Sequence, residues 1–245
     1  MLPPEFVQTA CIFGYDADMH LLLPLIFIVA LVFGPGWWVR HVMSRYNTPA
    51  DRYDGSGGEL ARYLLDGLGL QDVKVEESSE GDHYDPQEKV IRLTAGNLNG
   101  RSLTAVTVAA HEVGHALQDA TGYAPLKVRG QLIMLTRPIE RLGAGILMAA
   151  PFVGMLTRVP LVSLLMIVGG MMSLGATTLV HLVTLPTELD ASFRRALPML
   201  EKSGALKPVD LPHARRLLKA AALTYLSASL ASLLNIARWW ALLRR

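Results

Sequence analysis

The stretch AAHEVGHAL, residues 109–117, combines the residue types and the residue spacing that a metal site requires. His111 and His115 are four residues apart, so on an α-helix both imidazoles lie on one face and can reach the same ion. Glu112 lies beside them, within reach of a water molecule on that ion. This combination is the signature of a catalytic zinc site in which the glutamate is the general base. An ordinary surface helix is the alternative, and the apolar lead-in 103–110 argues against it.

The composition places the chain among membrane proteins. Of its 245 residues 51% are hydrophobic, and they are clustered in long runs rather than spread in short ones. The net charge is only +2, which gives no electrostatic support to a nucleic-acid partner. Cys11 is the single cysteine, so an intrachain disulfide and a cysteine-rich metal site are excluded.

The apolar runs predict a mainly α membrane protein with about four transmembrane helices. The first run, 21–39, is long enough to cross the hydrocarbon layer and closes an N-terminal segment 1–39. Runs at about 139–157 and 160–185 are separated by a very short connection, so 139–185 is predicted to be an antiparallel transmembrane hairpin. The last run, roughly 220–237 within a C-terminal segment 220–245, is either a fourth span or an interfacial helix.

The distribution of charge predicts the orientation of the chain in the membrane. Trp37 and Trp38 lie where an interfacial belt is expected, and Arg40, Arg45 and Arg52 follow them. The positive-inside rule then places residues 40–138 in the cytoplasm. Residues 186–219 are also basic and form a second inside loop. We therefore expect a multi-pass protein of the cell membrane with its catalytic domain on the cytoplasmic side.

The segment 40–138 is predicted to be a small α+β, zincin-like domain inserted after the first span. Leucines at helical spacing predict a helix over 58–68, and β-rich runs at 73–76 and 90–93 predict a hairpin around a polar turn at 78–87. Residues 90–94 are a candidate edge strand that could receive an extended substrate. Ser102 is the expected N-cap of the metal-site helix, and Gly122 with Pro125 is expected to end it.

A catalytic zinc ion usually takes three protein ligands, so another stretch must supply the third. The metzincin extension requires glycine and histidine where this chain has Gln118 and Thr121. Glu140 and Glu188 are the acidic candidates. Glu140 lies between two arginines, where an ion pair is the ordinary reading. Glu188 directly follows the hairpin that returns the chain to the side of His111, and we assign it as the ligand.

Two neighbours of Glu188 affect this assignment. Pro186 suits the first turn of a new helix, where acidic side chains also complement the helix dipole, which is the alternative role for Glu188. Asp190 is two residues beyond Glu188, which on a helix places it on the opposite face, so both cannot point at the same metal ion. It is expected to hydrogen-bond a histidine or an arginine near the metal.

At this point the chain resembles, over essentially its whole length, the membrane-bound neutral zinc metallopeptidases of the bacterial YugP family. The matching motifs are DHYDP at 82–86, AAHEVGHA at 109–116, GYAPLK at 122–127, LPTE at 185–188 with Ala191 and Ser192, and AAALTY at 220–225. The resemblance implies a zinc peptidase, and its similarity to gluzincins, which carry a downstream glutamate, supports Glu188.

The leading hypothesis is zinc-dependent hydrolysis of a peptide bond in a protein or peptide substrate. His111, His115 and Glu188 hold Zn²⁺ and Glu112 is the general base. His83, with Tyr84, is a candidate donor to the oxyanion, although such residues more commonly stabilise a turn.

Two other functions stay open beside this hypothesis. One is an intramembrane protease, which is disfavoured because 103–117 is short and contains three ionisable groups. The other is a zinc-stabilised, non-catalytic scaffold for partner proteins in the lipid bilayer.

Overall fold

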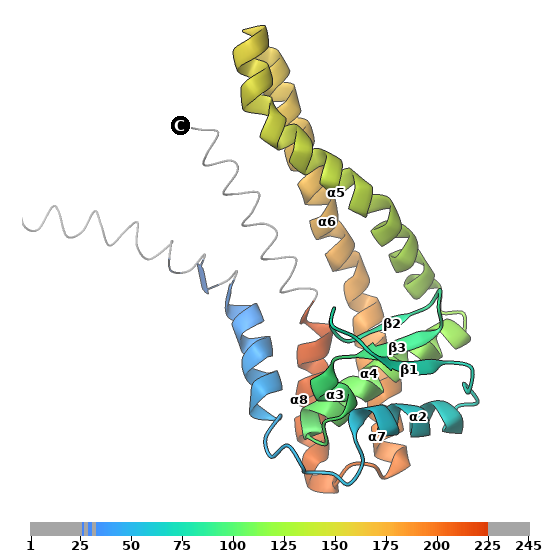
Figure 1. The fold of residues 1–245 in the computed structure, drawn as a ribbon. Coiled ribbons are helices and arrows are strands. Elements are labelled where there is room, and N and C mark those ends of the chain that lie inside the picture. Colours follow the sequence, from blue (N-terminus) through green and yellow to red (C-terminus); the bar gives the residue numbers. More distant parts are fainter. Residues whose placement is uncertain (1–25, 27–28, 31–32, 225–245) are drawn as a thin grey trace, which may run out of the picture.

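The computed structural model describes residues 26, 29–30 and 33–224, without the side chains of 137, 140, 160, 174–179 and 181–182. A helix over 33–45 comes first (Figure 1). The elements that follow are α2 (Gly57–Gly67), β1 (Lys74–Glu77), β2 (His83–Asp85), β3 (Val90–Leu93), α3 (Ala95–Leu98), α4 (Leu103–Ala120), α5 (Ala124–Thr157), α6 (Pro160–Leu189), the π-helical turn η1 (Asp190–Ala196), α7 (Leu197–Ser203), the 3₁₀ turn η2 (Pro208–Asp210) and α8 (Leu211–Ala222). The described chain is thus mostly helical with one small sheet, as predicted.

Helix α4 is the centre of the fold, with α2, η1, α8 and the sheet packed around it (Figure 1). Nearly all of its side chains are buried, including Ala109, Ala110 and Val113. The helix begins at its predicted cap, where the Ser102 hydroxyl accepts a hydrogen bond from the backbone N–H of Ala105 at 3.1 Å. It ends just before Gly122, whose φ of +67° lies in the left-handed region that favours glycine. Both predicted helix boundaries are confirmed.

The predicted hairpin of 73–76 with 90–93 is wrong. The strand order is β1-β3-β2, and β1 pairs with β3 in parallel, with Lys74 opposite Val90. The antiparallel partner of β3 is β2, which lies in the segment predicted to be a turn. The reason is that the His83–Asp85 strand is short and polar, without the alternation that marks a strand in sequence.

The corrected topology also changes which strand lies at the sheet edge. β3 is the central strand, so its backbone groups are already paired on both sides, and its side chains Val90, Ile91 and Leu93 are buried. The prediction that 90–94 receives a substrate at a free edge is therefore wrong. The two edge strands of the sheet are β1 and β2.

Helices α5 and α6 form an antiparallel hairpin that projects from the rest of the structure (Figure 1). The hairpin was predicted, but its first helix begins at Ala124 rather than at 139, so the proposed domain boundary at 138 falls inside α5. The two helices approach closely at small residues: a Cβ at Gly143 would lie 1.8 Å from Ser173 Oγ, and one at Gly154 would lie 2.1 Å from Ser163 Oγ. The Ser173 hydroxyl donates to the carbonyl of Ile139 at 2.8 Å. Polar and small side chains thus hold the two helices together.

One helix of the described part, α5, is long and apolar enough to cross a membrane, and Leu161–Ser173 of α6 is a shorter apolar stretch. Large side chains near the hairpin tip are exposed, such as Phe152 (74%), Met155 (81%) and Leu156 (85%). This supports membrane association. The predicted run 21–39 lies only partly within the described residues, and 220–237 lies almost wholly outside them, so four spans remain a prediction.

The end of α6 differs from the expectation at Pro186. This proline lies inside α6 rather than in the first turn of a new helix, and the chain continues into η1 without a break. Glu188 therefore lies within a continuous run of helical turns and not in the first turn of a new helix, so no helix N-terminus lies beside it. The dipole explanation for Glu188 is lost with this correction.

Candidate metal centre

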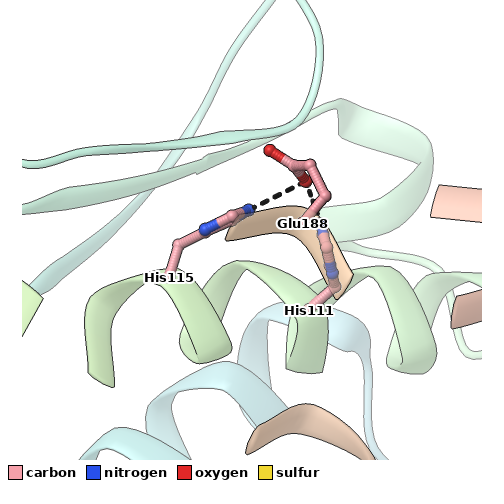
Figure 2. Close-up of side chains that lie close together, drawn as sticks. All are labelled: His111, His115 and Glu188. Carbon is pink, nitrogen blue, oxygen red and sulfur yellow. Dashed lines mark hydrogen bonds and ion pairs between the residues drawn. The ribbon is translucent and has the colours of Figure 1, made fainter. Parts of the chain in front are cut away.

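Three of the predicted residues converge in the structure: His111 and His115 from α4, and Glu188 from α6 (Figure 2). All are buried, and one ligand atom of each lies within 4.8 Å of the other two. Oε2 of Glu188 is 3.2 Å from Nε2 of His111 and 3.2 Å from Nε2 of His115. Residues 77 positions apart in the chain therefore meet at one point.

The geometry of this group fits a zinc ion. Two atoms that each lie about 2.0–2.1 Å from a tetrahedral zinc are about 3.3 Å apart, close to the two measured separations. The donors are also the right kind, since two imidazole nitrogens and one carboxylate oxygen are a usual zinc set. When Nδ1 carries the ring proton, Nε2 of each histidine is an acceptor, as is the Glu188 carboxylate, so a cation between them would satisfy all three buried atoms.

Glycine at position 114 allows the two segments to approach. A Cβ at Gly114 would lie 2.6 Å from the carbonyl oxygen of Ala191, closer than any real contact. Because there is no side chain here, η1 packs directly against α4. This contact brings Glu188 and Ser192, on either side of Ala191, next to the two histidines.

The hydrogen bonds of Ser192 determine which nitrogen of His111 carries the proton. The Ser192 hydroxyl donates its single hydrogen to the carbonyl of Leu218, at 3.1 Å. Its oxygen, 3.0 Å from Nδ1 of His111, must therefore act as acceptor. Nδ1 of His111 is then protonated, and the lone pair of Nε2 faces Glu188 and the metal position.

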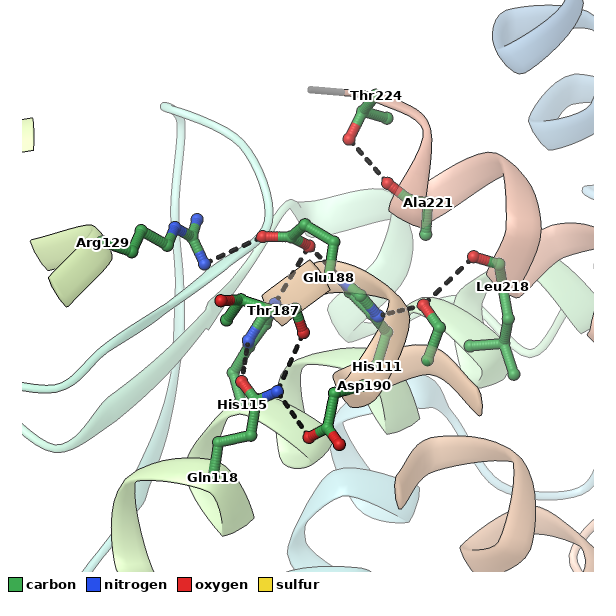
Figure 3. Close-up of polar contacts among 11 residues, drawn as sticks. His111, His115, Gln118, Arg129, Thr187, Glu188, Asp190, Leu218, Ala221 and Thr224 are labelled. Carbon is green, nitrogen blue, oxygen red and sulfur yellow. Dashed lines mark hydrogen bonds and ion pairs between the residues drawn. The ribbon is translucent and has the colours of Figure 1, made fainter. Parts of the chain in front are cut away.

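The hydrogen bonds of Gln118 likewise determine which nitrogen of His115 carries the proton (Figure 3). Its amide nitrogen donates to the carbonyl of Thr187 at 2.8 Å and to Oδ2 of Asp190 at 2.9 Å, which fixes the orientation of the amide. The amide oxygen, 2.9 Å from Nδ1 of His115, accepts that proton. Both histidines thus present an unprotonated Nε2, the form in which imidazole binds metal.

We predict that Gln118→Leu lowers the affinity for zinc by about 10- to 100-fold, the usual effect of losing a hydrogen-bond partner of a metal ligand. Leucine has a similar size but cannot accept the His115 proton. The measurement is competition for zinc with a chelator in detergent. Gln87→Leu, at an exposed position, is the matched control. Unchanged affinity in folded Gln118→Leu protein would contradict the proposed orientation of His115.

Asp190 lies where the sequence predicted, beside an arginine. Its Oδ2 accepts from Nε of Arg195 at 2.8 Å and from Gln118. Burial alone would raise the pKa of Asp190, but the hydrogen bonds from Arg195 and Gln118 lower it below its ordinary value. Asp190 is therefore an anion that holds the amide of Gln118 against His115.

Glu188 is held as an anion by its surroundings. Burial alone would raise the pKa of this carboxyl, but the neighbouring positive charge, including that of Arg129, lowers it well below its ordinary value. Nη1 of Arg129 lies 2.8 Å from Oε1, the oxygen that does not face the histidines. A charged carboxylate is the form that binds a metal ion.

Glu112 lies in the wall of a cavity of about 500 Å³ that also includes His111, His115 and Glu188. Its side chain is buried. Burial raises the pKa of Glu112 to about 7. A carboxyl group with such a pKa can both accept and release a proton near neutral pH.

His83 and Tyr84 line the same cavity from β2. Nδ1 of His83 lies 3.1 Å from the carbonyl of Gly81, so the neutral ring donates there and its Nε2 is an acceptor. The Tyr84 hydroxyl donates to Oδ2 of Asp119 at 2.9 Å, and burial raises the pKa of this hydroxyl. In this arrangement only a protonated His83 could donate to an oxyanion, and its catalytic role stays a prediction.

The other candidate ligand, Glu140, belongs to α5, but its side chain lies outside the described part. It is eleven residues beyond Arg129, about 16 Å along a helix at 1.5 Å per residue. Sequence reasoning missed three contributors to the site: Ser192, Arg129 and the role of Gln118. Gln118 lies three residues after His115 and Ser192 four residues after Glu188, and this helical spacing could have indicated that they lie near the ligands. No comparable spacing relates Arg129 to a ligand.

Comparisons with known proteins identify the family of this chain. A family model described as "Putative neutral zinc metallopeptidase" matches residues 21–244. The chain is 34% identical over 220 residues to "Putative membrane protease YugP" of Bacillus subtilis (strain 168), an alignment that covers 87% of this chain and 94% of that protein. No solved structure matches. Both matches include α4, the hairpin and the segment that carries Glu188.

Proposed function

Because this chain belongs to the neutral zinc metallopeptidase family, we propose that it hydrolyses peptide bonds at a gluzincin-type zinc centre held by His111, His115 and Glu188. The observation that carries the proposal is the convergence of three buried acceptor atoms on one cavity that also contains a buried glutamate. Zinc held there would supply Lewis-acid chemistry, acidifying a water molecule and polarising the carbonyl of the scissile bond.

The residues of the chain have distinct tasks in this proposal. Glu112 accepts a proton from the attacking water and returns it to the leaving nitrogen. Ser192 and Gln118 keep His111 and His115 in the protonation state that binds metal. The enclosing elements limit access of bulk water, since His111, Glu112 and His115 are each at most 6% exposed.

The substrate is a protein or peptide, and we propose that it is bound at the membrane surface. The cavity walls come from chain segments next to apolar runs: Val39 at the end of the first run, Arg129 near the start of α5, Glu188 at the end of α6, and Ala221 near the start of the last run. The cavity is thus lined by the parts of the chain that lie next to the apolar runs. A peptide close to the bilayer would reach it first.

This arrangement supports surface cleavage over an intramembrane reaction. Helix α4 is enclosed by α2, η1, α8 and the sheet rather than by lipid-facing helices alone. The basic residues that follow the first apolar run and those in 186–219 are expected on the same side of the membrane, and they support the cytoplasmic face. Membrane partner proteins remain compatible with the exposed apolar surface of the hairpin.

Metal removal tests the proposed function directly. Full-length protein purified in detergent is expected to contain one zinc ion per chain and to cleave a fluorescently labelled unfolded protein. Treatment with a chelator should abolish cleavage because the water is no longer activated, and added zinc should restore it. Bound zinc is measured by atomic absorption. Full cleavage by metal-free protein would exclude the proposed mechanism.

A further inference from the structure

Arg129 is a largely buried cation that the sequence alone does not connect with the site. It lies in the second turn of α5, and its side chain is 15% exposed. Nη1 lies 2.8 Å from Oε1 of Glu188, and the residue lines the cavity with both histidines (Figure 3). The ion pair therefore belongs to the interior of the site and not to the solvated surface, where such pairs contribute little.

The two oxygens of Glu188 have separate partners. Oε2 faces Nε2 of both histidines at 3.2 Å, whereas Oε1 faces Arg129. A carboxylate can bind a metal ion through one oxygen or through both. The positive charge of the Arg129 guanidinium holds Oε1 away from the metal position and so restricts the rotation of the carboxylate.

We propose that Arg129 is a positioning residue that restricts Glu188 to binding metal through Oε2 alone. The inference rests on the proposed function and adds the geometry of the third ligand to it. One-oxygen binding leaves a position on the ion open for water or a substrate carbonyl, as a catalytic zinc site requires.

Arg129 and Glu188 belong to the two different helices of the hairpin, so their ion pair connects the metal site with the packing of the hairpin. Arg129 is near the start of α5 and Glu188 is at the end of α6, so their ion pair closes the base of the hairpin. Farther along, Gly143 and Ser173 hold the same two helices in contact. The packing of the apolar hairpin thereby determines where the carboxylate of Glu188 lies.

The experiment compares Arg129→Ala, Arg129→Lys and Arg129→Gln with the wild type in detergent. Zinc affinity is measured by chelator competition, and the coordination geometry by the visible absorption spectrum of the Co²⁺-substituted protein. We expect Arg129→Ala to lower zinc affinity about 10- to 100-fold and to alter the Co²⁺ spectrum. Arg129→Lys should recover part of the affinity, since it restores the charge without the planar donor pair. Lys127→Ala, exposed on the same helix turn, should change neither.

Each outcome decides between distinct conclusions. Wild-type affinity and an unchanged Co²⁺ spectrum in Arg129→Ala would overturn the proposal while leaving the proposed function intact. Failure of the wild type itself to bind zinc would overturn the proposed function. Thermal unfolding of the metal-free variants reports whether they fold; if Arg129→Ala does not, the same comparison is decided by Arg129→Gln, which keeps a polar side chain but removes the charge.

Discussion

Replacing Glu112 with glutamine is expected to lower the rate of peptide-bond hydrolysis by about 10²- to 10⁴-fold, the usual contribution of a general base. Glutamine has nearly the same shape and remains buried in the same wall of the cavity, but an amide cannot accept a proton from water. Zinc content should stay at the wild-type level, because Glu112 is not among the three converging ligand atoms. Cleavage of the labelled unfolded protein and bound zinc are measured on the same preparation.

This variant also separates a peptidase from a zinc-stabilised scaffold. A scaffold would keep its partner binding and stability with Glu112→Gln, and no turnover would be lost because none existed. Glu76→Gln, at an exposed position of β1, is the control for loss of one carboxylate. Wild-type turnover by the Glu112→Gln protein would rule out the assigned role of this residue.

The metal-site helix was predictable because its signals are local. The spacing of His111 and His115, the cap at Ser102 and the stop at Gly122 each act within one or two turns of helix. The sequence could therefore predict both the helix boundaries and the face on which the imidazoles lie. The hairpin that returns Glu188 was predictable for a similar reason, since two apolar runs joined by a very short connection have few ways to pack.

The topology of the sheet was not predictable from local pattern. Strand β2 contains His83, Tyr84 and Asp85, which have no apolar alternation, and its formation depends on pairing with β3. The parallel pairing of β1 with β3 is likewise set by how the sheet packs on α4 and α2. Propensity along the chain gives no information about either.

The break expected at Pro186 shows the limit of residue preferences. Proline favours the first turn of a helix, but here α6 continues through it into η1, where Ala191 packs directly on Gly114 of α4. The same contact places Ser192 against His111. Tertiary packing thus overrides the local preference at the point where the second half of the site is built. Arg129 is a similar case, since its partner is 59 positions away and no spacing rule relates them.

Replacing Glu188 with alanine is expected to lower zinc affinity by more than about 10²-fold, beyond the effect of losing an outer hydrogen-bond partner, and to abolish hydrolysis. Two imidazoles alone hold zinc weakly compared with a set of three ligands. Alanine also leaves Arg129 in the cavity without the carboxylate that it contacts, so the metal-free variant should be less stable than the wild type. Zinc is measured by chelator competition, and stability by thermal unfolding of the metal-free protein.

Glu188→Gln and Glu140→Ala sharpen this test. Glutamine keeps the size of the side chain and an oxygen that can accept from Arg129, so it separates loss of the charged ligand from loss of packing. Glu140→Ala should bind zinc like the wild type, because the three converging atoms come from His111, His115 and Glu188. If instead Glu188→Ala retained zinc and Glu140→Ala lost it, the third ligand would come from α5, and the contact between Glu188 and Arg129 would only join the legs of the hairpin.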